Sequence, residues 1–287
     1  MNSIAFHKMY ARPTKDTNLL LANILCKFST IIMNLVLINP TLRAFDDRHN
    51  LNEIERLVTY KRIQFSPDDI LLLPEHFTSN DNAESYAEYI SKLAGIAGCT
   101  VVGGSHHRTL NGKRMNMGCV IDSRGTELGV YTKLRPYFNE QKHVVPGDRV
   151  GDIDINGKNF LILICADFWY SDILLNATRL PDVVLVPSLS VSRKPNADYS
   201  RTLWTHLAIT RAYEFGVFVG ISDWSENSRL PKNRTCGVSG LADPTQLDPE
   251  KFFTPVSQEG ISFFPLDFAA LNAFRDDRKM RGFFWKK

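Results

Sequence analysis

Residues 159–172 read NFLILICADFWYSD, and the five consecutive apolar residues at 160–164 lie between polar flanks. This pattern is typical of a strand that is buried on both faces. Such strands belong to sheets covered by helices or by a second sheet, and the loops at their carboxyl ends commonly carry chemistry. Cys165 follows where this strand should end, and a helix beginning a few residues later would help to hold its thiolate. Cys165 is therefore our candidate nucleophile.

Working outward from this stretch, predicted strands and helices alternate along most of the chain. The predicted helices span 50–63, 83–97 and 199–215, and Asn156-Gly157 predicts a hairpin turn before the Cys165 strand. The other predicted strands are 31–38, 69–73, 100–103, 117–122, 127–133, 181–186, 216–221, 238–242 and 260–265. No linker, low-complexity tract or internal repeat interrupts them. The sequence thus predicts a single α/β domain of layered sheets and helices.

The N-terminal part of the chain differs from the rest. Residues 1–18 are polar and aperiodic, whereas residues 19–38 are apolar enough to raise the question of a membrane span or a signal sequence. Lys27 lies near the middle of that segment, which costs roughly 2.5–3.5 kcal/mol on insertion scales, and no small-residue cleavage pattern follows. We therefore expect an N-terminal arm over residues 1–30, one domain over 31–287, and no membrane segment.

Composition excludes several classes of function. The 287 residues are 44% hydrophobic and 23% charged, as is usual for a globular chain, and the net charge is only +3 with scattered Lys and Arg. We therefore expect no nucleic-acid partner and no anionic membrane partner. The five cysteines are far apart and form no C-x-x-C pair, which favours a reducing, cytoplasmic setting.

Motifs for metal or phosphate binding are incomplete. The sequence from Asp152 to Gly157 begins like a calcium loop, but Leu163 occupies the position that needs a bidentate glutamate. His106-His107 lacks the partner spacing of a metal site, so we interpret it as a pair in a loop. No phosphate-binding loop and no complete G-x-S-x-G motif is present. We therefore predict no metal and no cofactor.

Three reactive side chains each follow an apolar run closely: Glu75, Lys133 and Cys165. At one end of a sheet they could form an acyl-transfer site in which the thiolate attacks a carbonyl, the carboxylate transfers the proton and the ammonium stabilises the oxyanion. On residue types alone, a buried inert cysteine with two surface charges explains the same pattern.

The order of several longer segments resembles the nitrilase superfamily of carbon–nitrogen hydrolases, from about residue 31 to the C-terminus. The matching segments are LLPEHF (72–77), VVGGS (101–105), YTKLRP (131–136), PGD (146–148), ILICAD (162–167), VLVPS (184–188), RAYE (211–214) and GVSGLADP (237–244). Each segment alone is a weak signal, and the ordered set is a strong one.

This resemblance implies an α-β-β-α sandwich, a Glu-Lys-Cys triad without a cofactor, and homodimers or higher homo-oligomers packed through helices. It implies that Glu75 is the general base and acid, Cys165 the nucleophile and Lys133 the oxyanion stabiliser. Glu140, seven residues after the lysine, fits the family's second, orienting glutamate. The backbone N–H of Ala166 fits the second oxyanion donor.

The residues after Cys165 depart from the family's patterns. Ala166 stands where an aromatic residue is frequent and where nitrilases carry Trp-Glu, which favours amide over nitrile hydrolysis. Trp169 and Ser171 replace the Arg and Pro of many amidases, so a carboxylate clamped by that Arg is in doubt. We expect Ala166, Trp169 and Ser188 to contact the substrate, a small-molecule amide with an apolar or planar acyl group, although the rings could equally serve the core.

The leading prediction is a hydrolase that cleaves an amide or carbamoyl carbon–nitrogen bond through a thioester on Cys165. A nitrilase, or an acyltransferase that passes the thioester to an amine, is the alternative among enzymes. A degenerate relative acting as a binding or scaffold protein is the alternative outside them, although degenerate relatives usually lose a triad member and none is missing here.

Overall fold

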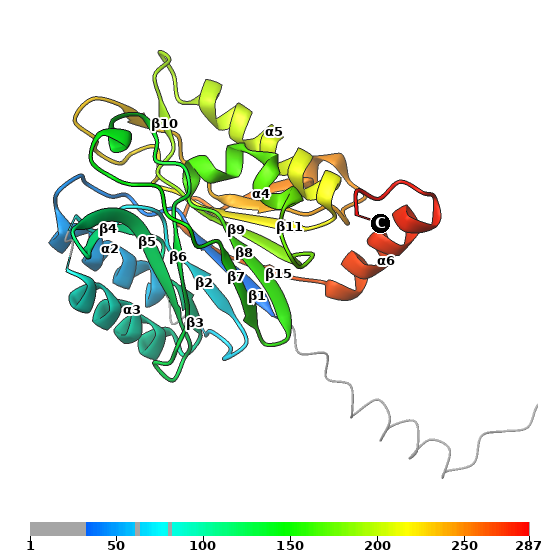
Figure 1. Cartoon of the computed structure of the whole chain (residues 1–287), viewed down its shortest axis with the longest axis horizontal. Helices are drawn as coiled ribbons and strands as arrows, with labels where there is room; N and C mark the ends of the chain where they lie inside the picture. The colour runs from blue at the N-terminus through cyan, green and yellow to red at the C-terminus, as the bar shows by residue number, and fades with distance from the viewer. Residues whose placement is uncertain (1–32, 61–63, 80–81, 287) are drawn as a thin grey trace, which may run out of the picture. The chain divides into compact units, whose positions relative to one another are not determined.

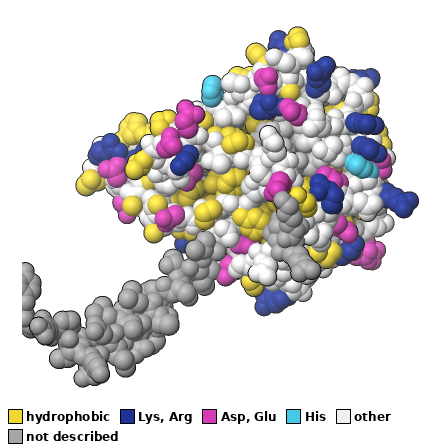
Figure 2. All heavy atoms as spheres, turned by 180° about the vertical axis from the view of Figure 1, so that it is seen from behind, with side chains coloured by type: hydrophobic (Ala, Val, Ile, Leu, Met, Phe, Trp, Pro, Cys, Tyr) yellow, Lys and Arg dark blue, Asp and Glu magenta, His cyan; other side chains and the backbone are white. Residues whose placement is uncertain are grey.

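The computed structural model describes residues 33–60, 64–79 and 82–286. The predicted arm at 1–30, the first residues of the strand predicted at 31–38, and Cys26 lie outside this range. Within the described residues, no helix combines the length and apolarity needed to cross a membrane. Figure 2 shows acidic and basic side chains interspersed on the face behind the view of Figure 1.

The first of two large sheets has seven strands. Its hydrogen-bonded order is β15-β1-β2-β3-β5-β4, and β6 also pairs with β5. β1, β2 and β3 are parallel, while the other pairings are antiparallel. The strands are β1 (Asn34–Ile38), β2 (Ile70–Leu72), β3 (Thr100–Val102), β4 (His106–Leu110), β5 (Lys113–Ile121), β6 (Glu127–Thr132) and β15 (Ile261–Pro265).

The second large sheet has six strands in the order β14-β13-β11-β9-β8-β7, with β8, β9 and β11 parallel. Asn156 (φ 52°) and Gly157 (φ 75°) join β7 to β8 with the two positive φ angles of a type I′ hairpin, which confirms the predicted turn. The strands are β7 (Gly151–Ile155), β8 (Lys158–Ile162), β9 (Val183–Pro187), β11 (Phe218–Ser222), β13 (Gly240–Ala242) and β14 (Phe253–Pro255); β10 (Val191–Ser192) and β12 (Arg234–Thr235) form a separate pair.

Helices cover the outer face of each sheet, giving the predicted four-layer α-β-β-α sandwich (Figure 1). Helices α2 (Asp47–Val58) and α3 (Ala83–Ala97) pack on the first sheet, and α5 (Asp198–Phe215) packs on the second. The remaining helical segments are α4 (Ser171–Leu175), α6 (Phe268–Met280) and the 3-10 turns η2 (Phe138–Lys142), η3 (Cys165–Trp169) and η4 (Pro249–Lys251).

The layers follow from apolar residues on both faces of the central strands. In β1, Leu35 and Leu37 face the second sheet, whereas Val36 and Ile38 face α2 and α3, because successive side chains of a strand point to opposite faces. The sheets approach closely at Gly220 of β11. A Cβ at this glycine would lie 2.3 Å from Cδ2 of Leu35, so only glycine fits without movement.

Several elements differ from the predictions, and β4 and α6 are two of those that were not predicted. His106 and His107 belong to strand β4, so their interpretation as a loop pair was wrong; the sequence HHRTL lacks alternation, and its pairing with β5 makes it a strand. Helix α6 was not predicted, because its sequence is rich in charged residues. Two of these, Arg275 and Arg278, are buried, and their guanidinium groups donate hydrogen bonds to backbone carbonyls of other segments.

Candidate active site

Glu75 lies three residues beyond β2, and its backbone is fixed on both sides. Its N–H donates to the carbonyl of Ser188 (3.2 Å), and its carbonyl accepts from Nε1 of Trp224 (2.7 Å). One side-chain oxygen accepts from the N–H of Leu189 (3.2 Å). Because Ser188 and Leu189 follow β9, these bonds join the carboxyl ends of strands from the two sheets.

Lys133 follows β6 and connects two carboxylates. Its Nζ donates to Oε1 of Glu75 (2.7 Å) and to Oε2 of Glu140 (2.8 Å), and only 3% of the lysine is exposed. Glu140 lies in η2, the 3-10 turn after the lysine segment, where it also accepts from the N–H of Tyr137 (3.0 Å). The structure therefore brings three of the four predicted catalytic side chains into direct hydrogen-bond contact.

Three further polar residues that the sequence predictions missed complete this network. Nδ2 of Asn116 donates to Oε1 of Glu75 (2.9 Å) and to Oε1 of Glu140 (2.8 Å). Nε2 of His107 lies 3.0 Å from the same oxygen of Glu140, and Nε2 of His76 lies 3.6 Å from Oε1 of Glu75. The sequence offers one signal for this network. Asn116 lies in the otherwise apolar run MNMGCVI, and a buried amide needs hydrogen-bond partners.

Cys165 begins the 3-10 turn η3 with φ 45°, an unfavourable backbone conformation for a residue other than glycine. Its Sγ lies 3.9 Å from the carbonyl of Leu189, the residue whose N–H binds Glu75. Asp167 accepts from the N–H groups of Leu134 (3.0 Å) and Arg135 (2.7 Å), and so ties the cysteine turn to the lysine segment. The helix anticipated after Cys165 is here only a five-residue 3-10 turn, followed by the short α4.

The charges in this network stabilise one another. Burial alone would raise the pKa of Glu75, but Lys133 and His76 outweigh it and hold the pKa below its usual value. Burial would likewise lower the pKa of Lys133, but the charges of Glu75 and Glu140 raise it. The pKa of Glu140 is also lowered, because hydrogen bonding by His107 and the charge of Lys133 outweigh burial. Lys133 is thus an ammonium between two carboxylates.

Cys165 differs from the thiolate anticipated from the sequence. Burial and the negative charge of Glu75 raise the pKa of the Cys165 thiol well above its usual value, and the opposing effect of Lys133 is smaller. The resting sulfur is therefore a neutral thiol, and Lys133 alone does not ionise it. A thiol in this state needs a base to remove its proton before it can act as a nucleophile.

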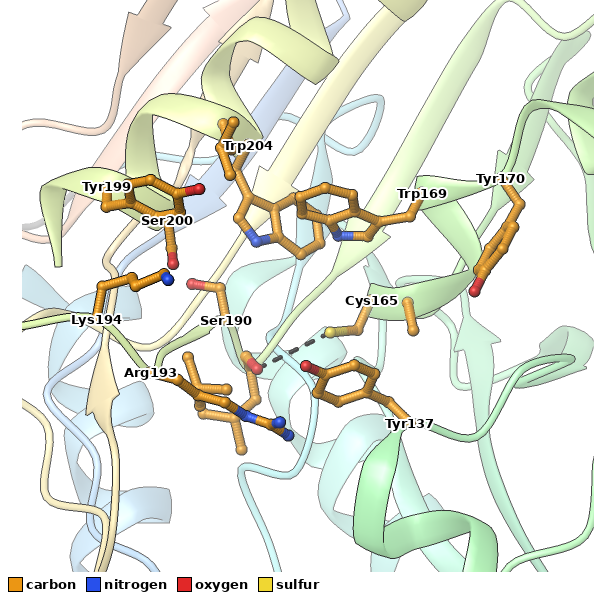
Figure 3. Close-up of a pocket in the computed structure, with 14 residues that line it drawn as sticks. Tyr137, Cys165, Trp169, Tyr170, Ser190, Arg193, Lys194, Tyr199, Ser200 and Trp204 are labelled. Carbon is orange, nitrogen blue, oxygen red and sulfur yellow. Dashed lines mark hydrogen bonds between the residues drawn. The ribbon is translucent and has the colours of Figure 1, made fainter.

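A cavity of about 360 Å³ opens above Cys165 (Figure 3). Ala166 and Trp169 line it, as does Ser190, whereas Ser188 does not and is fully buried. The Trp169 ring meets Trp204 of α5 edge to face, with ring centroids 5.3 Å apart. Of the residues expected to contact substrate, two face the cavity, and the third holds the backbone of Glu75.

The cavity wall also carries two cations that the sequence predictions missed. Arg193 and Lys194 follow β10 and line the cavity, and none of the described lining residues is acidic. The guanidinium of Arg193 lies 3.8 Å from the ring centroid of Phe138, and Nζ of Lys194 lies 5.5 Å from that of Tyr199. Their charges therefore rest against aromatic rings, with no ion pair to a described carboxylate.

The layered fold (Figure 1), with Lys133 between Glu75 and Glu140 close to Cys165, agrees with the resemblance found in the sequence. Residues 35–244 match the family model described as carbon-nitrogen hydrolase. The chain therefore belongs to the carbon-nitrogen hydrolase family of the nitrilase superfamily, and it is a hydrolase of that class.

The individual proteins that the chain resembles share a quarter or less of its residues. The chain is 25% identical over 222 residues to "Hydrolase in pqqF 5'region" from Pseudomonas protegens, covering 70% of this chain and 72% of that protein. Nit3 from Saccharomyces cerevisiae, a member of branch 10 of the nitrilase superfamily, matches with a TM-score of 0.70 at 22% identity over 87% of this chain and 96% of its own. The amidase from Nesterenkonia sp. AN1, in a double mutant with acrylamide, matches with a TM-score of 0.66 at 18% identity over 88% and 97%. These structures share the fold.

Proposed function

We propose that this protein hydrolyses an amide or carbamoyl carbon–nitrogen bond through a thioester on Cys165. The observation that carries the proposal is the buried network in which Lys133 bonds both Glu75 and Glu140, next to a cysteine that lines a cavity. A lysine held between two carboxylates keeps its charge in a buried site, where it acts most strongly on an oxyanion.

In the proposed mechanism, Glu75 accepts the thiol proton while the Cys165 sulfur forms a bond to the substrate carbonyl carbon. The resulting oxyanion is stabilised by Lys133 and by the N–H of Ala166, which lies in the first turn of η3 where N–H groups have no acceptor within the turn. Glu75 returns the proton to the nitrogen, the carbon–nitrogen bond breaks, and ammonia or an amine leaves. Water, deprotonated by Glu75, then releases the carboxylic acid and restores the thiol.

The cavity supports a more specific substrate class. Trp169 and Trp204 offer an aromatic wall for a planar or apolar part of the acyl group, while Arg193 and Lys194 add two positive charges without an acidic neighbour among the described lining residues. We propose that the acyl group carries a carboxylate that contacts these cations. They would replace the arginine that the sequence lacks at Trp169, and they come from a different segment.

Intact-mass spectrometry tests the thioester. The protein is mixed with primary amides, carbamoyl compounds and nitriles, each with and without a carboxylate. A substrate-dependent adduct that is absent in Cys165→Ala, together with release of ammonia or an amine, is the expected result. Adducts that form equally on Cys165→Ala, or no adduct and no turnover with any compound, would contradict the proposal. Transfer to an added amine would instead identify an acyltransferase.

The two cations have their own test once a substrate is found. Arg193→Ala and Lys194→Ala should raise KM at least tenfold for the carboxylate-bearing amide and leave the neutral analogue unchanged. Lys279→Ala on α6 is the matched control, because this lysine lies outside the cavity. Equal changes for both amides would show that the cations do not select the substrate.

A further inference from the structure

A cluster of three potential metal ligands lies beside the proposed catalytic network. His76, His107 and Glu140 each offer one ligand atom, and these atoms all lie within 4.8 Å of one another. Nε2 of His107 is 3.0 Å from Oε1 of Glu140, and Nε2 of His76 is 3.8 Å from the same oxygen. The two imidazole rings come from different elements: His76 follows Glu75, and His107 lies in β4.

These distances suit zinc. Bonds of about 2.0–2.1 Å in tetrahedral geometry place neighbouring ligand atoms about 3.3 Å apart. The distances of 3.0 Å and 3.8 Å from Oε1 of Glu140 to the two imidazole nitrogens bracket that value. Two histidines and one glutamate form a ligand set used for zinc in proteins, and imidazole ligands disfavour magnesium and calcium.

An ion can reach the cluster without passing Cys165. His76 and His107 line a second cavity, of about 690 Å³, which does not include the cysteine. Leu189 and Val191 line both cavities and form the wall between them. The cluster is half-buried, with 23% of the His76 side chain and 20% of the His107 side chain exposed.

The carboxylate that would bind the ion is already paired on its other oxygen. Two carboxylates, Glu75 and Glu140, face one ammonium, Lys133, in the network itself, while Arg114 and Lys232 line the wider cavity. Lys133 bonds Oε2 of Glu140, which leaves Oε1 as the oxygen directed at the histidines. A metal would take Oε1 without displacing the lysine.

We propose that His76, His107 and Glu140 form a zinc site that inhibits the enzyme. Zinc on Oε1 of Glu140 would take the place of His107 and Asn116 as partners of that oxygen. Asn116 also donates to Oε1 of Glu75, so its displacement would disturb the position of the proposed base. The inhibition is expected to reverse on chelation, because no covalent bond in the protein is broken. The binding part of the proposal stands independently of the substrate.

Zinc binding is measured on full-length Cys165→Ala, because the substitution removes the thiol as a competing zinc ligand. Competition with a chromophoric chelator should give one zinc per chain. We expect at least tenfold weaker binding after His107→Asn or Glu140→Gln in the same background, no change after His206→Asn on α5, and no competition by a hundredfold excess of magnesium. Thermal unfolding without zinc shows whether each variant is folded.

The outcomes separate the binding site from the inhibition. Absence of stoichiometric binding to folded Cys165→Ala, or equal binding by the folded His107→Asn and Glu140→Gln variants, would overturn the site. If the site binds zinc but a substrate is turned over equally with zinc and with chelator, the inhibitory role is overturned. If no substrate is ever turned over, the hydrolase proposal fails while the zinc titration still decides the site.

Discussion

At the scale of single residues, Cys165 is distinguished from the other described cysteines by access. Burial raises the pKa of the Cys99 and Cys119 thiols to about 12 and that of Cys236 to about 11, and none of these three lines the cavities described above. The Cys165 pKa is raised too, but its sulfur faces a cavity and has a carboxylate network beside it.

We therefore expect iodoacetamide to label Cys165 at least tenfold faster than Cys99, Cys119 or Cys236 in the native protein. The rate should rise with pH throughout the range from 6 to 9, because the reactive thiolate is a minor form below the raised pKa. Peptide mass spectrometry after timed quenching gives the four rates. A rate for Cys165 that is already at a plateau at pH 6 would contradict the neutral resting thiol.

Lys133 leads to a prediction about both stability and rate. Lys133→Met leaves two buried carboxylates without their cation, which costs about 3–5 kcal/mol of unfolding free energy. The double variant Lys133→Met, Glu140→Gln should recover part of that loss, because the two residues interact directly. Urea unfolding measures both. Additive losses would show that the pair is not coupled.

Lys133 is also the proposed oxyanion donor, so Lys133→Met should lower kcat by roughly 10²–10³ where the variant folds.

The main catalytic candidates, Glu75, Lys133 and Cys165, could be named from the sequence, because the ordered segments that contain them resemble the nitrilase superfamily; their places after apolar runs were not enough alone. Their partners could not. Asn116 lies inside a strand, and which partners a side chain meets there depends on the register between strands. Arg193 and Lys194 lie in a polar segment that the sequence does not distinguish from ordinary surface residues. Its position beside the cavity depends on how the chain packs around the second sheet.

At the scale of elements, the site depends on bonds between segments that follow different strands. Asp167 accepts two backbone N–H groups of the lysine segment, those of Leu134 and Arg135, and is 1% exposed. Asp167→Ala would leave two buried donors without partners, which costs about 1–3 kcal/mol each. We expect a loss of about 2–6 kcal/mol in urea unfolding.

The control for Asp167 is Asp172→Ala. Asp172 is exposed, and its carboxylate lies 2.5 Å from the guanidinium of Arg135. Asp167, in contrast, binds the backbone N–H of that arginine. Exposed ion pairs contribute little, so this variant should unfold close to wild type. If both alanine variants lose the same stability, the two backbone bonds are not the cause.

Elements with a clear hydrophobic period could be predicted, and those formed by tertiary contacts could not. The helix expected at 83–97 is present with the same bounds. Strand β4 has a polar sequence and is a strand because five of its residues pair with β5. Cys165 lies three residues beyond the end of β8, because the strand ends at Ile162, before the apolar run does, and η3 begins at Cys165.

At the scale of the whole molecule, the close approach of the two sheets at Gly220 has a measurable consequence. Gly220→Ala would place a methyl group 2.3 Å from Cδ2 of Leu35, within the central core. Overpacking of this kind costs about 1–3 kcal/mol. In urea unfolding, Leu35→Val should cost less in the Gly220→Ala background than in wild type, because the shorter side chain makes room. Equal costs in both backgrounds would place the strain elsewhere.

Buried Asp223 predicts a pH dependence of global stability. Burial raises its pKa to about 6, although Ser190 and the N–H of Val238 donate to it. Because the unfolded value is about 3.9, the stabilisation is fully present below about pH 4 and is lost as pH rises through about 6, a change on the order of 3 kcal/mol. Urea unfolding of Asp223→Asn from pH 4 to 7 should therefore show a smaller decline than wild type. Parallel curves would contradict this.

The proposed nucleophile and its base come from different sheets: Glu75 follows β2 of the first, and Cys165 follows β8 of the second. An intermediate with only one sheet formed would hold the cysteine without its network, at an ordinary thiol pKa and open to solvent. With these proposed roles, both sheets must be docked before Cys165 can form a thioester. Recovery of thioester formation during refolding would time that last step, separately from the earlier return of secondary structure.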